Sequence, residues 1–324
     1  MRGGRDMRVL VTGGLGYLGG RIVQALAGRP DVAVRVLAHG ARPLPSGFPP
    51  GVEVRRGDVL NPESLRGVCD GVSHVVHLAG LNQAASRKSP GDALAISGSG
   101  TLHLASEAAE AGAGRFLYVS SIHVYGAART GRVSEEAPTV PVSWYGASRV
   151  VGELTAQMVG RDRGLSVVVL RLSNGYGPPA YPGTTCWELM VNDLCRQAAR
   201  RGEIALRTSG TQLRDFVAVT DIVRAIDLFA SAPDGVTGGG TFNVGSGRLH
   251  TVLSVAECVR DAFAEVSGRR IPIHVGAEAA AEPPMPHVDI TRARAVGYVP
   301  EADLREELHR TLAAAAGPLG EDAP

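Results

Sequence analysis

Lysine is almost absent from this chain: Lys88 is the only one among 324 residues, and the other cationic side chains are arginine and histidine. Acidic and basic side chains are nearly balanced, which gives a formal net charge of +1. A chain with so little excess charge has no strong electrostatic attraction for nucleic acids or anionic membranes. We therefore expect no nucleic acid and no membrane as a partner.

Cysteine is also scarce, and long apolar runs are missing. The four cysteines show no C-x-x-C pair and no spacing typical of metal ligands. No apolar stretch approaches the roughly 20 residues that cross a bilayer, and the N-terminal segment lacks the apolar region of a signal peptide. We expect reduced thiols, no metal site and a cytoplasmic protein.

Glycine, in contrast, is abundant and is concentrated in a motif near the start of the chain. An apolar run at 9–11 leads into 12–19, which reads T-G-G-L-G-Y-L-G, and a helical pattern follows. Gly13 suits a tight turn, Gly16 a close approach to a pyrophosphate, and Gly19 close packing of helix on strand. A strand before and a helix after such a motif indicate a dinucleotide site at the helix N-terminus. The predicted contacts are Gly13, Gly16, Tyr17, Leu18 and Gly19.

Strand-like and helix-like segments alternate through the first half of the chain, which predicts a parallel sheet built from βαβ units. Asn61 and Pro62 are typical of a helix start. The expected strands cover 33–37, 52–55, 72–78, 115–119 and 166–170, with another near Phe242. The expected helices include 92–111, 145–162, 187–201, 220–231, 251–266 and 303–315.

The alternation breaks in a glycine- and proline-rich stretch at 175–185, where we place a change of domain. We predict an α/β fold with a Rossmann-type doubly wound parallel sheet and a smaller C-terminal substrate domain. The predicted division is 7–174 for the dinucleotide-binding domain, with 217–245 returning to it, 175–216 and 246–316 for the substrate domain, and a disordered tail at 317–324.

Three further motifs follow the glycine segment in order. Ser121 precedes V-Y-G at 124–126, Y-G-A-S-R occupies 145–149, and R-D-F occupies 214–216. With these motifs the chain resembles an extended short-chain dehydrogenase/reductase over about residues 8–310. Within that superfamily it resembles the NAD-dependent epimerase/dehydratase family, whose members act on nucleotide sugars.

The resemblance implies roles for several residues. Tyr145 would exchange the proton of a sugar hydroxyl, and Ser121 would hydrogen-bond the sugar oxygen. A free phenol has a pKa near 10, so this chemistry needs nearby positive charge. Arg149, four positions after Tyr145 on the same face of a helix, would supply it. Asn174 and Arg214 match residues that bind the diphosphate of the substrate.

Three positions depart from the family pattern. Arg149 replaces a lysine, Ser97 replaces an asparagine, and the second family arginine expected near residue 282 is missing. Arginine keeps the positive charge of lysine but does not release a proton in the usual pH range. Two interpretations stay open: a working site that follows the general scarcity of lysine, or a relaxed site that only binds its cofactor.

Ile122 and His123 bear on the type of reaction. The 4,6-dehydratase branch has an Asp-Glu pair at these positions, and Ile122 cannot replace the acid, so we do not expect dehydration. His123 lies where the GDP-fucose synthase-like branch has an epimerising cysteine, and a histidine could act there as acid or base. The alternative is a hydrogen-bonded histidine at the end of a strand.

The choice of cofactor depends on the end of the second strand. An NAD site normally has an acidic residue there for the ribose 2′-hydroxyl, but this chain has Ala38, with Arg42 close behind. This pattern favours NADP(H), with NAD(H) as the alternative. By resemblance, Asp58 and Val59 flank the adenine, and Leu78, Ala79 and Gly80 pass beneath the cofactor.

We therefore expect an NAD(P)(H)-dependent oxidoreductase that acts on a nucleoside-diphosphate sugar. A ketoreductase is the first choice, because of the 38–42 segment. The alternatives are an NAD-dependent epimerase with a transient keto intermediate, and a non-catalytic dinucleotide-binding sensor. The resemblance also implies a homodimer formed through the helices at 92–111 and 145–162.

Overall fold

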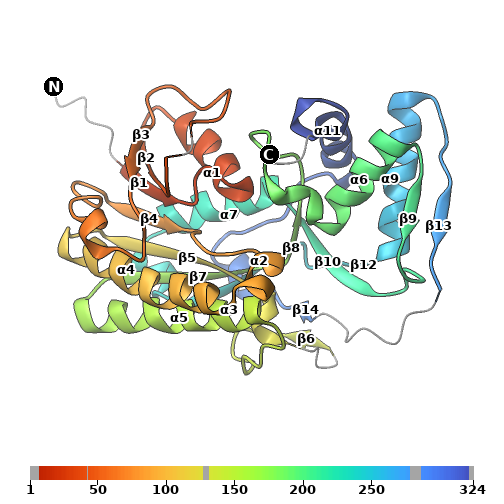
Figure 1. Ribbon diagram of the computed structural model, residues 1–324. Coiled ribbons are helices and arrows are strands. Elements are labelled where there is room, and N and C mark those ends of the chain that lie inside the picture. Colours follow the sequence, from red (N-terminus) through yellow and green to blue (C-terminus); the bar gives the residue numbers. More distant parts are fainter. Residues whose placement is uncertain (1–6, 42, 127–130, 278–285, 321–324) are drawn as a thin grey trace.

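The computed structural model describes residues 7–41, 43–126, 131–277 and 286–320. At its centre lies a seven-stranded sheet in the order β11-β7-β5-β4-β1-β2-β3 (Figure 1). All neighbouring strands in this sheet are parallel. The predicted Rossmann-type fold is thus confirmed. The seven strands are β1 (Met7–Thr12), β2 (Val32–Ala38), β3 (Glu53–Arg56), β4 (His74–His77), β5 (Arg115–Ser121), β7 (Ser166–Leu172) and β11 (Thr241–Val244).

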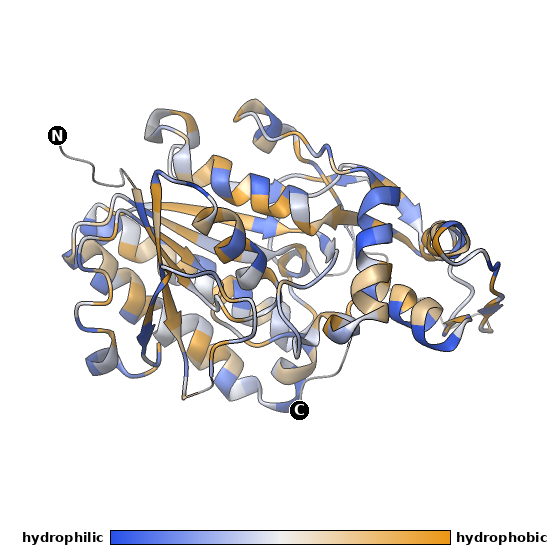
Figure 2. Ribbon diagram, turned by 90° about the horizontal axis from the view of Figure 1, so that it is seen from above, coloured by the Kyte–Doolittle hydropathy of each residue, from blue (hydrophilic) through white to orange (hydrophobic). Residues whose placement is uncertain are grey.

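Helices cover both faces of the sheet, so its strands are apolar on both sides, as the hydropathy colouring shows (Figure 2). On one face, α1 (Tyr17–Ala27) and α7 (Val219–Ser231) bury Ile22 and Phe229 in a shared core. On the other face, α4 (Thr101–Glu110) and α5 (Trp144–Arg163) close a second core over β4, β5 and β7.

Two helix predictions need correction. The segment expected as one helix over 92–111 consists of α3 (Pro90–Ala95), a π turn at Ile96–Gly100 and α4, preceded by α2 (Gln83–Lys88). Gly100 lies so close to Val59 that a methyl group there would come within 2.7 Å of it. The helix expected after Asn61 is a single 3-10 turn, Pro62–Leu65, although the Asn61 side chain caps it by accepting from Glu63 N at 3.2 Å.

A smaller lobe, at the right in Figure 1, follows β7. Its core lies among α6, α9 and α11 and two small sheets, in the orders β12-β10-β8 and β13-β9. The elements of this lobe are β8 (Asn174–Tyr176), α6 (Met190–Arg201), β9 (Ile204–Leu206), β10 (Leu213–Ala218), β12 (Leu249–Thr251), α9 (Val252–Ser267), β13 (Ile273–Val275) and α11 (Leu304–Ala316). The remaining short elements are β6 (Arg132–Val133), η3 (Ile122–Tyr125), η4 (Thr185–Glu188), α8 (Asp234–Thr237), β14 (His287–Val288), α10 (Thr291–Ala295) and η5 (Pro318–Gly320).

Two segments differ from the proposed division of the chain. Residues 287–298 were expected in the substrate domain, but their apolar side chains pack in the core beside α1 and α7, and Tyr298 donates to Gly245 O at 2.9 Å. Residues 317–320 were expected to be disordered, but Trp187 Nε1 donates to Leu319 O at 3.0 Å and Arg200 Nη2 to Gly317 O at 2.9 Å. These contacts fix the end of α11, and residues 321–324 lie outside the described part.

Among the described helices, none has the length and apolarity to cross a membrane. The four cysteines are unpaired in the structure, and Cys69, Cys186 and Cys195 are buried.

Candidate functional site

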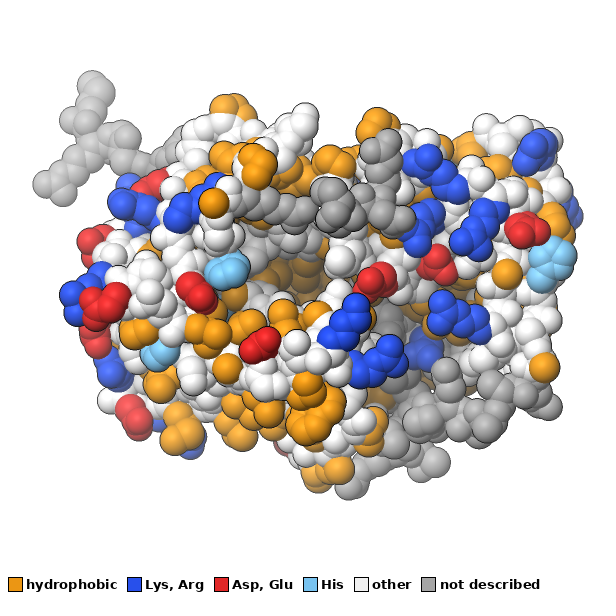
Figure 3. All heavy atoms as spheres, in the orientation of Figure 1, with side chains coloured by type: hydrophobic (Ala, Val, Ile, Leu, Met, Phe, Trp, Pro, Cys, Tyr) orange, Lys and Arg blue, Asp and Glu red, His pale blue; other side chains and the backbone are white. Residues whose placement is uncertain are grey.

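A cleft of about 950 Å³ runs along the carboxyl ends of the central strands and faces the smaller lobe. The hollow is visible between the two parts of the molecule in Figure 3. It brings together all the predicted site residues that the structure describes; Arg42, also predicted, lies outside the described residues. The predicted residues lining the cleft are Gly13, Gly16, Tyr17, Leu18, Gly19, Asp58, Val59, Leu78, Ala79, Gly80, Ser121, His123, Tyr145, Arg149, Asn174 and Arg214.

The glycine turn between β1 and α1 forms one end of the cleft. Gly13 has a φ of +67°, which favours glycine, and Gly16 N donates to its carbonyl oxygen at 2.9 Å. A side chain at Gly19 would overlap that same carbonyl group. Helix α1 begins after Gly16 without a side-chain cap, so the N–H groups of its first turn face the cleft uncapped. This arrangement fits the pyrophosphate of a dinucleotide.

Tyr17 differs from its neighbours in the motif because its side chain reaches the smaller lobe. Its hydroxyl donates to Gly177 O at 2.9 Å, and Asn192 Nδ2 donates to the same oxygen at 2.8 Å. Burial raises the pKa of Tyr17. The Tyr17 side chain is therefore engaged with the smaller lobe, so only the Tyr17 backbone could make the predicted contact with a cofactor.

A buried histidine that sequence reasoning missed supports the loop at 78–80. Thr12 Oγ1 accepts from the backbone N–H groups of Leu78 and Ala79 at 3.1 and 3.0 Å, so its proton is free to go to His77 Nδ1, 2.8 Å away. His77 Nε2 then donates to Thr101 Oγ1 at 3.1 Å. Burial, with a smaller effect of Arg149, lowers the pKa of His77 to about 3, which keeps the ring neutral.

Ser121, His123 and Tyr145 meet where β5 ends and α5 begins. Ser121 Oγ lies 2.9 Å from His123 Nδ1, and the His123 ring packs edge-on against Tyr145 with 5.4 Å between centroids. Burial, with a smaller contribution from Arg214, lowers the pKa of His123 to about 4. The imidazole is therefore neutral near pH 7, and a tautomer with the proton on Nδ1 donates to Ser121 Oγ and leaves the Ser121 hydroxyl proton for another acceptor.

Arg149 lies one turn beyond Tyr145 on α5, with its guanidinium carbon 5.1 Å from the centre of the Tyr145 ring. The side chain is buried, and Nη2 donates to Leu81 O at 3.3 Å. Burial acts to lower the pKa of Arg149, but Tyr145 and Tyr118 outweigh it, and the net shift is upward. Arg149 is thus a permanent cation beside Tyr145.

A second buried group missed by sequence reasoning fixes the base of the site. Glu153 on α5 and Arg171 on β7 form an ion pair of 2.7 Å with both side chains buried. Ser120, next to Ser121, donates to Glu153, and Arg171 Nη1 donates to the Tyr125 hydroxyl at 2.9 Å. The pair ties α5 to β5 and β7, which carry the residues of the site. Glu153 follows Tyr145 by eight residues, but that spacing alone does not reveal a partner on β7.

Asn174 and Arg214 lie together on the opposite wall of the cleft. Asn174 Nδ2 and Ser173 Oγ both donate to Asp215 O at 2.8 Å. The Asp215 carboxylate accepts from Ser246 N and Gly247 N at 2.9 and 2.8 Å, and burial raises its pKa. The Asp215 carboxylate thus binds the backbone of the 246–247 turn. This contact holds β10, and with it Arg214, in place.

The end of β2 has no acidic residue of its own, because Ala38 is the last residue of the strand. The nearest carboxylate that lines this part of the cleft is Asp58, whose oxygen lies 3.6 Å from His39 Nε2. Arg56 Nη1 donates to Gly40 O at 2.9 Å, which places a guanidinium beside the loop after β2.

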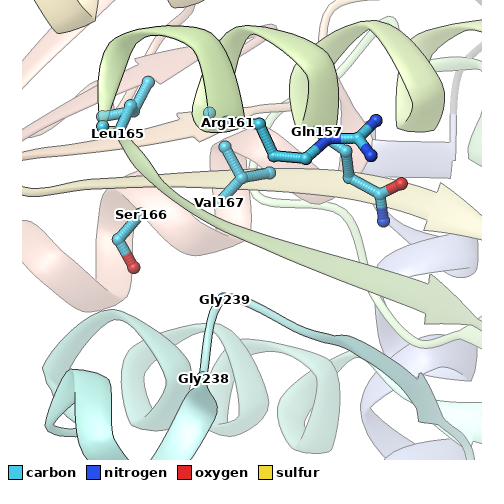
Figure 4. A pocket seen from close by; sticks show the side chains of 9 residues that line it. Gln157, Arg161, Leu165, Ser166, Val167, Gly238 and Gly239 are labelled. Carbon is cyan, nitrogen blue, oxygen red and sulfur yellow. The ribbon is translucent and has the colours of Figure 1, made fainter.

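A second cavity, of about 540 Å³, lies at the opposite end of β7. Gln157, Arg161 and Ser166 line it with a glycine pair, Gly238 and Gly239 (Figure 4). None of the predicted site residues lines it. Within the described ranges, no group of three or more His, Cys, Asp or Glu side chains could hold a metal ion.

The fold and the cleft together define the class. A doubly wound sheet, a glycine turn at the end of its first strand, and a Ser–Tyr pair beside the cleft are features of the extended short-chain dehydrogenases/reductases. A family model described as the NAD dependent epimerase/dehydratase family matches residues 9–245, and the chain belongs to that family.

Individual relatives agree with this assignment. A UDP-glucose 4-epimerase of Azospirillum brasilense is 32% identical over 321 residues, 94% of this chain and 90% of that protein. The structure of a UDP-glucose 4-epimerase of Thermotoga maritima with UDP-glucose has a TM-score of 0.82 at 25% identity, covering 95% of this chain and 98% of that one. MoeE5 in complex with UDP-glucose and NAD has a TM-score of 0.75 at 29% identity, covering 94% and 97%.

The comparisons confirm the predicted family and fold. The family description and the MoeE5 complex name NAD, so they give no support to the NADP(H) preference expected from Ala38.

Proposed function

We propose that the protein is an NAD-dependent epimerase of a nucleoside-diphosphate sugar, with a UDP-hexose as the first substrate to test. The observation that carries the proposal is the meeting of Ser121, Tyr145 and the permanent cation Arg149 in one cleft, opposite Asn174 and Arg214. The names of the relatives support the substrate class, since two are UDP-glucose 4-epimerases. This choice replaces the ketoreductase favoured by the sequence.

The residues of the cleft fit NAD as a cofactor. The uncapped first turn of α1 would hold the pyrophosphate, Asp58 and Val59 the adenosine, and Gly80 and Arg149 the nicotinamide half. When bound, NAD supplies a hydride acceptor and donor.

The chain itself handles the proton. Arg149 stabilises the phenolate form of Tyr145, which takes the proton of the sugar hydroxyl; Tyr145 is then a neutral phenol, and it becomes a phenolate again when it returns the proton. Ser121 hydrogen-bonds the sugar oxygen and keeps it within reach of Tyr145. With a pKa of about 4, His123 is a weak base, so we assign it to orienting Ser121 and not to proton transfer.

Dehydration fits the site poorly. Ile122 is fully buried in the apolar core and offers no acid at that position. His123 alone cannot replace a pair of groups that remove one proton and donate another. Inversion at a single carbon needs only one proton-exchanging group beside the cofactor, which Tyr145 provides.

An NADPH-dependent ketoreductase is the second candidate, and Ala38 is the observation that favours it. Incubation with UDP-glucose, followed by NMR of the sugar anomeric signals, separates the two candidates. Epimerisation predicts a second UDP-hexose at equilibrium without added NAD(P)H and without any lasting change in nicotinamide absorbance. Consumption of NADPH in step with reduction of a keto sugar would establish the ketoreductase. Tight cofactor binding without turnover of any sugar tested would favour the sensor.

A homodimer is the assembly we propose. On α5 the residues Trp144, Val151, Leu154 and Met158 are 36–55% exposed, and they recur with the spacing of a coiled-coil stripe. Leu102 adds an exposed apolar side chain on the adjacent α4. Such a stripe on neighbouring helices suits a second copy of the same surface.

Replacing both Leu154 and Met158 with glutamate would place like charges against each other across this interface. We expect the variant to sediment as a monomer, while Val266→Glu, at an exposed apolar residue of α9 away from α5, leaves the assembly unchanged. Equal sedimentation of the double variant and the wild type would reject this interface.

A further inference from the structure

The two lobes of the molecule meet at Gly177, the residue that follows β8. Its φ of +138° favours glycine, and a methyl group there would lie 2.6 Å from both Val219 Cγ1 on α7 and Glu307 Oε1 on α11. Helix α7 packs on the central sheet, whereas α11 belongs to the core of the smaller lobe. The backbone of Gly177 therefore fills the space between the lobes and leaves no room for a side chain.

The peptide groups of Gly177 are held by side chains from both lobes. Gly177 N donates to Asn192 Oδ1 at 3.0 Å, and Gly177 O accepts from Asn192 Nδ2 at 2.8 Å and from the Tyr17 hydroxyl at 2.9 Å. Asn192 is fully buried in the first turn of α6, and Tyr17 is the first residue of α1. One carbonyl oxygen thus joins the starts of two helices from different lobes.

Both of these helices begin at the cleft. The first turn of α1 presents the uncapped N–H groups that suit a pyrophosphate, and Leu189, Met190 and Val191 at the start of α6 line the cleft from the smaller lobe. The bonds of Tyr17 and Asn192 to Gly177 therefore connect the wall for the cofactor with a wall for the sugar nucleotide.

The connection between the two walls is short and stiff. Pro178 and Pro179 follow Gly177, both are buried, and the ring of each proline fixes its own φ. A second contact between the lobes lies beside Gly177, because Thr220 Oγ1 on α7 donates to the two carboxylate oxygens of Glu307 at 3.2 and 3.1 Å. A displacement at the start of α1 is therefore passed on to α6 and is not absorbed by a loose loop.

We propose that Tyr17 is a positioning residue that couples binding of the dinucleotide to binding of the nucleoside diphosphate of the substrate. The sugar-nucleotide part of this inference rests on the proposed function. A ligand that immobilises the first turn of α1 also immobilises the start of α6 through Gly177, so the second ligand loses less conformational freedom when it binds. Each ligand then raises the affinity for the other by the same factor.

Tyr17→Phe removes one hydroxyl from this connection. Gly177 O keeps its bond from Asn192, so the variant leaves no buried group unpaired and should fold. The matched control is Tyr181→Phe. The Tyr181 ring packs on α1 where a methyl group at Gly20 would lie 2.8 Å from Cε2, but its buried hydroxyl has no hydrogen-bond partner among the described residues. Both variants lose a buried hydroxyl at α1, and only the first loses a bond between the lobes.

Calorimetric titration with UDP, without NAD and with saturating NAD, measures the coupling. We expect NAD to raise the affinity for UDP about 10-fold in the wild type and in Tyr181→Phe, and about 2-fold or less in Tyr17→Phe. The same factor in Tyr17→Phe as in the wild type, or no coupling in the wild type, would overturn the role of Tyr17.

Amide hydrogen exchange with NAD alone needs neither UDP nor turnover. NAD should slow exchange at residues 192–196 of α6, beyond those that line the cleft, in the wild type and Tyr181→Phe but not in Tyr17→Phe. This result in a protein that converts no sugar would keep the inference and reject the proposed function. Epimerisation of UDP-hexoses, with equal exchange in the wild type and Tyr17→Phe, would keep the proposed function and reject the coupling.

Discussion

The two ends of the cleft are built in different ways. At the glycine turn between β1 and α1 the backbone itself forms the site, and a single methyl group at Gly19 would overlap the carbonyl of Gly13. At the start of α5 the site depends on side chains, since Ser121 on β5 meets Tyr145 and Arg149 on α5. The glycine turn therefore excludes a side chain at Gly19, whereas the other end depends on which side chains are present.

The largest effect is expected at the glycine turn. Gly19→Ala forces the turn apart and should weaken NAD binding on the order of 100-fold, with about 1–3 kcal/mol lost from the free energy of unfolding. Urea unfolding and NAD titration measure the two quantities. Gly91→Ala in α3 is the control, since a methyl group there meets open space, and it should be neutral or stabilising by up to about 1 kcal/mol. Similar results for the two variants would contradict the described packing.

The adenosine part of the same end tests the cofactor assignment. Ala38→Asp would place a carboxylate where it accepts from a ribose 2′-hydroxyl and repels a 2′-phosphate. We expect the ratio of NAD affinity to NADP affinity to rise about 10-fold, which corresponds to about 1.4 kcal/mol. Calorimetric titration with both cofactors gives the ratio, and an unchanged ratio would show that the 2′ position lies elsewhere.

An effect of pH is expected at the buried His77, which supports the loop at 78–80. Its folded pKa of about 3 lies below the ordinary value near 6.5, so the unfolded state binds more protons between these values. Stability supplied by this histidine is therefore lost as the pH falls below 6.5. Between pH 7 and 5 the free energy of unfolding of the wild type should fall by about 2 kcal/mol more than that of His77→Gln, which does not titrate. Parallel curves for the two proteins would show that the pKa of His77 is not lowered in the folded protein.

The contrast between the backbone-built end and the side-chain-built end of the cleft also explains how far the sequence could predict the structure. The glycine turn, the positions of the parallel strands along the chain, Ser121 and Tyr145 are local patterns, since each depends on a few consecutive residues and the period of one element. The Glu153–Arg171 pair and the close approach of Arg149 to Gly80 join residues on different elements, and no spacing within one element indicates them.

Two failures of prediction have specific causes. Residues 96–100 follow a helical pattern, but Gly98 and Gly100 allow the extra residue of a π turn, which the pattern does not register. Residues 287–298 follow the substrate lobe in sequence, yet Ile290 and Tyr298 are apolar enough to return to the core of the central sheet. Chain order alone does not assign such a segment to one lobe.

The most direct test of the account is the turnover of UDP-glucose by Tyr145→Phe, followed by NMR. The account predicts a loss of about 100- to 10,000-fold in kcat, because the group that exchanges the sugar proton is gone, with NAD binding and melting temperature close to those of the wild type. Turnover at the wild-type rate by a folded, NAD-binding Tyr145→Phe variant would contradict the central claim that Tyr145 carries the proton.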